Sequence, residues 1–294
     1  MIHPRRSLLF MPGSNSRALE KARILAADCI ILDLEDSVAP EAKGLARDQI
    51  AKAIAAGGFG KREIWIRTNA LGTPFWADDV KMAAKAKPHA LLVPKVSSVD
   101  DIRTIKKALA ETSADPSIRL WAMIETARAV LHAEELAAAS CDVEPRLSGF
   151  VFGPNDISRE TRIRMQPGRA IMLPMIIHCI LATRAYGLEI LDGPYSDFSN
   201  VDGFNQECTQ ARDLGFDGKT LIHPGQIEAC NVIFTPPADD VARARKIIAA
   251  FELPENAARG AISLDGQMVE RLHADMAHRT IALADSIAAM AKLP

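Results

Sequence analysis

LWAMIET, at residues 120–126, is a run of apolar residues that ends in a carboxylate and a hydroxyl group. The run is short and does not alternate with polar residues, which is typical of a strand that is covered on both faces. Similar runs recur at 7–11, 29–34, 64–68, 90–94, 149–152, 189–191 and 219–222, and helical periodicity fills most of the intervals. We therefore predict a (β/α)₈ TIM barrel, with a doubly wound parallel sheet as the alternative.

Polar residues follow nearly every predicted strand. They are PGSN at 12–15, ED at 35–36, RTN at 67–69, Lys95, ET at 125–126, PND at 154–156, Asp192 and HP at 223–224. In a parallel barrel the carboxyl ends of the strands open at the same face, where active sites lie. We expect these groups to converge on one mouth.

Two carboxylates follow consecutive predicted strands, Glu125 and Asp156. Magnesium usually takes one or two protein carboxylates and fills its other positions with water and substrate oxygens. We expect these two to bind Mg²⁺, although a salt-bridged surface pair is the alternative. Glu35 and Asp36 are expected to orient the waters around the metal. Asp33 lies within its predicted strand and is expected to be structural.

Arg67 ends an otherwise apolar strand, so we expect its side chain to be directed at the mouth. A guanidinium there can bind a carboxylate or stabilise an enolate oxygen, whereas an ion pair with Glu35 or Asp36 is the structural alternative. Lys95 would suit a Schiff-base aldolase, but the nearby carboxylate pair favours metal chemistry. We therefore expect Lys95 to be an electrostatic or structural partner.

Composition sets the broader limits. The 294 residues, 48% of them hydrophobic, suit one barrel domain at 1–235 and a helical extension at 236–294, with helices expected at 238–251 and 268–291. The extension would either close the barrel or form a lid over a neighbouring subunit. The net charge of −2 gives no reason to expect nucleic acid, and five scattered cysteines suggest reduced thiols. The chain shows no signal peptide or membrane span, so we expect a cytoplasmic protein.

Several blocks of the sequence form a recognisable set. They are RSLLF at 6–10 with Pro12 and Gly13, LDLEDSVAP at 32–40, IRTN at 66–69, VPK at 93–95, IET at 124–126, FGPND at 152–156 and the stretch 219–226. Together they resemble the citrate lyase beta-subunit-like branch of the HpcH/HpaI aldolase superfamily. These blocks span most of the chain. Members of the superfamily include citryl-CoA, malyl-CoA and citramalyl-CoA lyases and malyl-CoA thioesterase.

The resemblance implies functions for individual residues. Glu125 and Asp156 would bind magnesium, and Arg67 would contact the carboxyl or thioester end of the substrate. Coenzyme A would lie near the loop after the first strand, with Arg6, Pro12 and Gly13 as contributors. Related lyases carry a G-x-M-I-D segment whose aspartate reaches a neighbouring active site as acid and base. Here the segment is GQMVE at 266–270, so Glu270 replaces the aspartate.

The expected activity is therefore a magnesium-dependent carbon–carbon lyase. It would cleave a 3-hydroxyacyl-CoA thioester, such as malyl-CoA or citramalyl-CoA, to acetyl-CoA or a related acyl-CoA and a 2-oxo acid. Arg67 would stabilise the enolate and Glu270 would shuttle protons. A malyl-CoA-type thioesterase and the beta subunit of a multi-subunit citrate lyase are the alternatives. The resemblance also implies a homo-oligomer, a trimer or hexamer.

Overall fold

Eight parallel strands close into a barrel in the computed structural model, which describes residues 3–256 and 258–291. The strands are β1 (Ser7–Pro12), β2 (Cys29–Asp33), β3 (Glu63–Arg67), β4 (Ala90–Val93), β5 (Arg119–Ile124), β6 (Leu147–Phe152), β7 (Glu189–Asp192) and β8 (Gly218–Leu221). β1 pairs with both β2 and β8, which closes the barrel. The predicted TIM barrel is confirmed, and the open, doubly wound sheet is excluded.

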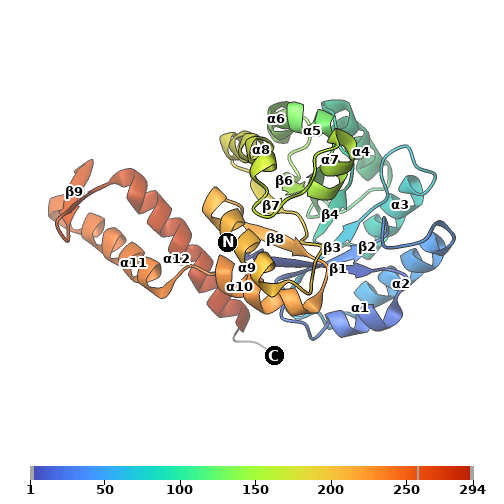
Figure 1. Cartoon of the computed structure of the whole chain (residues 1–294), viewed down its shortest axis with the longest axis horizontal. Coiled ribbons are helices and arrows are strands. Elements are labelled where there is room, and N and C mark those ends of the chain that lie inside the picture. Colours follow the sequence, from blue (N-terminus) through green and yellow to red (C-terminus); the bar gives the residue numbers. More distant parts are fainter. Residues whose placement is uncertain (1–2, 257, 292–294) are drawn as a thin grey trace. The chain divides into compact units, whose positions relative to one another are not determined.

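Helices connect successive strands and surround the barrel (Figure 1). They are α1 (Ser16–Ala22), α2 (Lys43–Ala56), α3 (Trp76–Ala86), α4 (Val99–Glu111), α5 (Ala127–Leu131), α6 (Ala133–Asp142), α7 (Pro154–Thr161), α8 (Leu173–Ala185), α9 (Val201–Leu214) and α10 (Ile227–Phe234), with short 3₁₀ turns η1 (Pro40–Ala42), η2 (Ala170–Met172) and η3 (Pro224–Gln226). Together, strands and helices form a compact unit over Arg5–Phe234.

Alternate residues of each strand fill the inside of the barrel. The interior cluster contains Trp65 and Trp121, whose ring centroids lie 4.6 Å apart. Gly149 makes room for them, because a Cβ at that position would lie 2.6 Å from the ring of Trp121. Since side chains alternate along a strand, the positions two residues after an interior residue also point inward. By this rule β5 directs Met123 and then Glu125 into the barrel.

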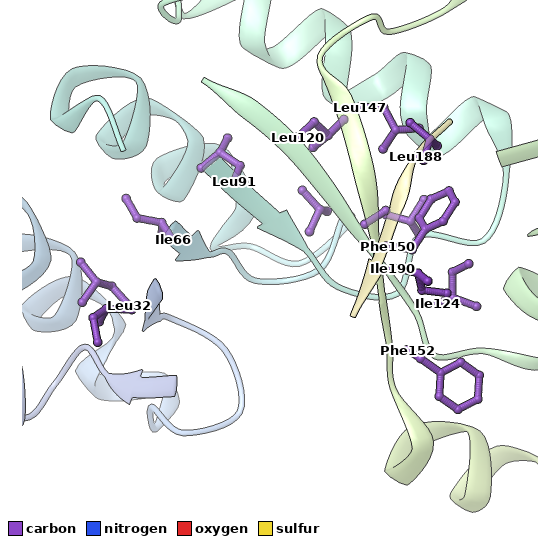
Figure 2. Close-up of a cluster of buried hydrophobic side chains, with 14 of the residues drawn as sticks. Leu32, Ile66, Leu91, Leu120, Ile124, Leu147, Phe150, Phe152, Leu188 and Ile190 are labelled. Carbon is purple, nitrogen blue, oxygen red and sulfur yellow. The ribbon is translucent and has the colours of Figure 1, made fainter. Parts of the chain in front are cut away.

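The other residues of the strands pack outward against the helices. Figure 2 shows this layer, with labelled side chains that include Leu32, Ile66, Leu91 and Phe150. Because both faces of the strands are covered, the strands are apolar along most of their length, as the sequence predicts. Each strand therefore has a defined inner and outer face, and this fixes which polar residues at the strand ends can point into the mouth.

A second unit comprises residues 3–4 and the described residues from Thr235 onward. It contains α11 (Ala238–Glu252), η4 (Pro254–Asn256), a hairpin of β9 (Ala261–Leu264) and β10 (Gln267–Glu270), and α12 (Arg271–Ala291). The two long helices lie side by side, and Phe251, Ile262 and Val269 share a small apolar core. The predicted helix over 268–291 is wrong at its start, since 268–270 form a strand. Residues 257 and 292–294 of the expected extension lie outside the described residues.

None of the helices in the described parts of the chain combines the length and the apolar character that crossing a membrane requires.

Candidate active site

A cavity of about 360 Å³ opens among the carboxyl ends of the barrel strands. Its polar lining is Asp33, Asp36, Ser37, Arg67, Glu125, Asn155 and Asp156, and its apolar lining includes Phe10, Met123, Pro154, Pro194 and Ile222. Two larger hollows, of about 660 and 630 Å³, lie on the outside of the barrel, beside α9 and between α2 and α3, away from the ends of the strands. Among the predicted polar groups, the cavity is lined by Asp36, Arg67, Glu125, Asn155 and Asp156, whereas residues 12–15, Lys95, Asp192 and His223 are not part of its lining.

Glu125 directly follows β5 and is 2% exposed. Its Oε1 accepts a hydrogen bond of 2.8 Å from the backbone N–H of Lys95. The neighbouring strand accommodates this side chain through Gly153, because a Cβ there would overlap the Cβ of Glu125 and lie 2.9 Å from its Oε2. The pKa of Glu125 is raised to about 8, chiefly by burial and also by the charges of Glu35 and Asp156.

Asp156 lies in the first turn of α7, four residues after the end of β6. Asp156 and Glu125 line the same cavity, although only Glu125 directly follows its strand. Pro154 begins this helix, a position that suits proline because the first turn needs no N–H donor there. One oxygen of Asp156 pairs with the exposed Arg159 one helical turn later, at 2.6 Å. An exposed pair of this kind holds a carboxylate only weakly.

Arg67 is the last residue of β3, and three groups hold its guanidinium. Asp33 accepts hydrogen bonds from Nε at 2.6 Å and from Nη2 at 2.7 Å, and Glu35 lies 3.0 Å from Nη1. The ring of Phe10 lies under the guanidinium, 4.6 Å from its carbon. Burial alone would raise the pKa of Asp33, but the charge and hydrogen bonds of Arg67 lower it below its ordinary value. Arg67 is thus buried, charged and fixed in direction.

Lys95 lies in the turn after β4 and contacts two of these carboxylates. Its backbone N–H holds Glu125, and its Nζ pairs with Oε1 of Glu35. Burial raises the pKa of Glu35 above its ordinary value, although Arg67 and Lys95 oppose this effect. The expectation that Lys95 is an electrostatic partner agrees with these contacts.

The other predicted site residues lie in different places. Asp36 is exposed and lines the cavity. Pro12 and Gly13 lie at the carboxyl end of β1 outside the cavity lining, and Gly13 packs so closely on α2 that a Cβ would lie 2.7 Å from Ile50. Arg6 precedes β1 and pairs with Asp28 at 2.7 Å, so it lies at the opposite end of the barrel from the cavity. That placement does not suit the substrate contact that the resemblance implied.

Glu270 ends β10 in the second unit, so it is not one of the residues that the barrel itself brings to the cavity. It is half-buried, and its backbone N–H donates to Nδ1 of His273 at 2.9 Å. Its function as acid and base stays a prediction.

Sequence reasoning missed several residues of the site. Asp33 was expected to be structural, and it does hold Arg67, but it also lines the cavity. The signal lay in the strand period, because Asp33 comes two residues after Ile31 and alternation places both on the inner face. Phe10 and Met123 were read only as strand residues. By the same period they face inward and form apolar parts of the lining.

The donor set fits a magnesium ion. Among the described residues no group of three or more His, Cys, Asp and Glu is placed to hold a metal, so the site offers two carboxylates, within the one or two that magnesium usually takes. The remaining oxygen of Glu125, Oε2, accepts no hydrogen bond in the parts of the chain that the structure describes. A buried carboxylate with a raised pKa and acidic neighbours is a place where a cation relieves repulsion.

Known proteins are similar to this chain over most of its length. The profile of the HpcH/HpaI aldolase/citrate lyase family matches residues 6–224. A (3S)-malyl-CoA thioesterase of Cereibacter sphaeroides is 44% identical over 287 residues, which cover 98% of this chain and 97% of the relative. Citrate lyase subunit beta of Escherichia coli is 32% identical over 286 residues, which cover 96% and 93%.

A solved structure is also similar over nearly the whole chain. The crystal structure of CitE from Mycobacterium tuberculosis in complex with magnesium, acetoacetate and coenzyme A has a TM-score of 0.73 and 28% sequence identity. The alignment covers 95% of this chain and 97% of that one. The similarity therefore extends beyond the barrel motifs.

Proposed function

The chain belongs to the HpcH/HpaI aldolase/citrate lyase family, as its sequence motifs predict, and from this premise we propose that it hydrolyses a malyl-type CoA thioester with the help of magnesium. The observation that carries the proposal is one cavity in which the carboxylates of Glu125 and Asp156 lie with the guanidinium of Arg67. A cation site and a fixed positive charge suit a substrate with a carboxylate at one end and a thioester at the other.

Glu125 and Asp156 would hold the magnesium ion. When bound, magnesium would supply a Lewis acid that polarises substrate oxygens. Glu125 is positioned to bind the metal, because the backbone N–H of Lys95 holds one of its carboxylate oxygens and Gly153 leaves room for the other. Asp156 would exchange its exposed partner Arg159 for the cation.

Arg67 would stabilise negative charge that develops on the thioester oxygen. Its guanidinium is already oriented by Asp33 and Phe10, so little reorganisation is needed during the reaction. Burial strengthens its effect, because charges interact more strongly away from bulk water. Coenzyme A itself would extend from the cavity toward the solvent.

Glu270 would act as the acid and base, carried by the second unit of a neighbouring copy of the chain in a homo-oligomer. This assignment rests on the family resemblance of the 266–270 segment. In hydrolysis, a carboxylate takes a proton from water while the oxygen attacks the thioester carbon. The C–S bond then breaks, and the proton leaves with the thiol of coenzyme A, which gives free malate.

Hydrolysis is our first candidate because the relatives of 44% identity over almost their full length are named (3S)-malyl-CoA thioesterase. The second candidate is carbon–carbon cleavage, the activity that the sequence predicts, and the citrate lyase beta subunits at 31–33% identity favour it. In that reaction the C–C bond breaks, its electron pair forms the thioester enolate beside Arg67, and a proton completes acetyl-CoA. The hydroxyl proton is lost, and glyoxylate is released.

Product analysis separates the candidates. Purified protein is incubated with (3S)-malyl-CoA and Mg²⁺, and the products are identified by chromatography and mass spectrometry. We expect malate and free coenzyme A. Glyoxylate with acetyl-CoA would establish the lyase instead. If no free CoA ester is turned over, but an acyl-carrier thioester is cleaved with added partner subunits, the chain is a subunit of a citrate lyase.

A further inference from the structure

Lys95 adopts a backbone conformation that is rare for its residue type. Its φ is +56°, in the left-handed region that favours glycine. Other non-glycine residues with positive φ, such as Lys87 and Arg162, cap the ends of helices. Lys95 instead follows a strand at the mouth of the barrel. Strained residues of this kind persist where the surrounding structure imposes them, often at functional sites.

In this left-handed turn, Lys95 contacts two carboxylates that come from different strands. Its N–H points to Oε1 of Glu125, which follows the next strand, at 2.8 Å. Its side chain extends in the other direction to Glu35, which follows β2. Lys95 therefore joins the proposed metal ligand to the group that surrounds the guanidinium of Arg67.

The charges around Arg67 explain why an ammonium group is needed there. Two carboxylates, Asp33 and Glu35, lie within 3.0 Å of the guanidinium and would together outweigh its single positive charge. Lys95 pairs with the carboxylate of Glu35, while a second ammonium, that of Lys43, donates to the backbone carbonyls of Leu34 and Glu35. Without Lys95, the surroundings of the guanidinium would be more negative by one charge and would disfavour an oxyanion that forms on the substrate.

We propose, resting on the function proposed above, that Lys95 is a positioning residue that keeps Arg67 available to the substrate by neutralising Glu35. It touches neither substrate nor metal in this proposal. Its backbone fixes Glu125 and its ammonium sets the charge around Arg67, so the two contributions can be separated by changing the side chain alone. A Schiff-base function does not fit, because Nζ is held as an ammonium against Glu35.

Lys95→Met tests the charge while keeping the backbone N–H. We expect kcat for (3S)-malyl-CoA to fall at least about tenfold with KM within about threefold, since Arg67 acts on charge that develops in the transition state. The Kd for Mg²⁺, measured by calorimetry without substrate, should stay the same or decrease, because the site becomes more negative. A variant with a damaged site would bind Mg²⁺ more weakly, so a lower kcat with unchanged or tighter Mg²⁺ binding is expected only under the proposal.

Three further variants complete the experiment. Lys95→Arg keeps the charge and should retain kcat within about threefold of the native protein. Glu35→Gln combined with Lys95→Met removes one charge of each sign, so its kcat should be no lower than that of Lys95→Met alone. Lys87→Met is the matched control, because Lys87 also has a positive φ, of +53°, but is 68% exposed in its side chain and pairs with Asp115. It should leave kcat and magnesium affinity unchanged.

The outcomes distinguish the two proposals. If the native protein turns over malyl-CoA with magnesium and Lys95→Met does so within about twofold, the function of Lys95 is refuted and the proposed function stands. Weaker Mg²⁺ binding by Lys95→Met, or a further additive loss in the double variant, also refutes it. If the native protein neither binds Mg²⁺ nor turns over the thioester, the proposed function fails, and the inference fails with it.

Discussion

Arg67 and Asp33 are register partners on neighbouring strands, and two hydrogen bonds of 2.6 and 2.7 Å join their side chains at the end of the barrel interior. The side chain of Asp33 is fully buried and that of Arg67 is 11% exposed. The pair therefore has two consequences, one for stability and one for the direction of the guanidinium.

Asp33→Asn tests the first consequence. The substitution leaves a buried guanidinium with one carboxylate partner fewer, and breaking a buried ion pair in this way destabilises a protein by about 3–5 kcal/mol. We expect a loss at the lower end of this range, because Glu35 still lies 3.0 Å from Nη1. Urea unfolding measures the loss. Asp100→Asn is the control, since its pair with Arg103 is exposed and should contribute less than about 1 kcal/mol; equal losses in the two variants would contradict the prediction.

Magnesium should stabilise the protein more as the pH rises. The pKa of Glu125 in the folded protein is raised to about 8, whereas in the unfolded chain it keeps its ordinary value. Between these two pH values the folded state binds a proton that the unfolded state has lost, so the free energy of unfolding decreases as the pH rises. A cation competes with that proton and binds the folded state. We expect the gain in melting temperature on adding Mg²⁺ to increase from about pH 6 to about pH 9.

Differential scanning fluorimetry with and without Mg²⁺ measures this gain. Glu125→Gln is the control, because its amide does not titrate and is a poorer ligand for magnesium. It should show a small gain at every pH. A gain in the native protein that does not change with pH would mean that protonation of Glu125 and metal binding are not linked.

The barrel could be predicted from the sequence because the apolar character of each strand is visible in the strand's own residues. A run such as 120–124 shows its burial on both faces in its own residues, and the intervening helices follow from spacing. The same reasoning placed Glu125 and Arg67 at the mouth. The position of Asp156 on a helix was not predicted, because the chain turns at Gly153 and begins α7 before it reaches Asp156.

The pairing of Arg67 with Asp33 is not local. The two residues are 34 positions apart, and they meet because β2 and β3 pair in a particular register. A shift of β2 by one residue in this register would turn the side chain of Asp33 away from the barrel interior. The backbone of Lys95 is a similar case, since no local pattern in VPK at 93–95 predicts a positive φ. The carboxylates that this residue contacts come from other strands.

Gly153→Ala should weaken magnesium binding without unfolding the barrel. A Cβ at this position would overlap the side chain of Glu125, so the carboxylate must move. We expect the Kd for Mg²⁺ to rise by about tenfold or more, because ligand geometry is demanding for this ion, and activity to fall in parallel. Calorimetry measures the affinity. Gly44→Ala is the matched control, since a Cβ there meets nothing within 4 Å and alanine favours the helix by about 1 kcal/mol.

Glu270 offers the sharpest separation of an acid–base function from a structural one. Glu270→Gln keeps the shape and removes the titrating group, so kcat should fall by about 10² or more if this carboxylate transfers protons, while KM changes little. Glu270→Asp keeps the carboxylate but shortens the side chain by one methylene, and we expect it to retain more activity than the glutamine variant. Steady-state kinetics on (3S)-malyl-CoA, with product analysis of each variant, measures both effects. The resemblance implies an aspartate at this position in lyases, so a shift of products from malate toward glyoxylate in Glu270→Asp would show that the length of this side chain selects between hydrolysis and cleavage. Full activity of Glu270→Gln would remove the residue from the mechanism and leave the proton acceptor to be found within the barrel.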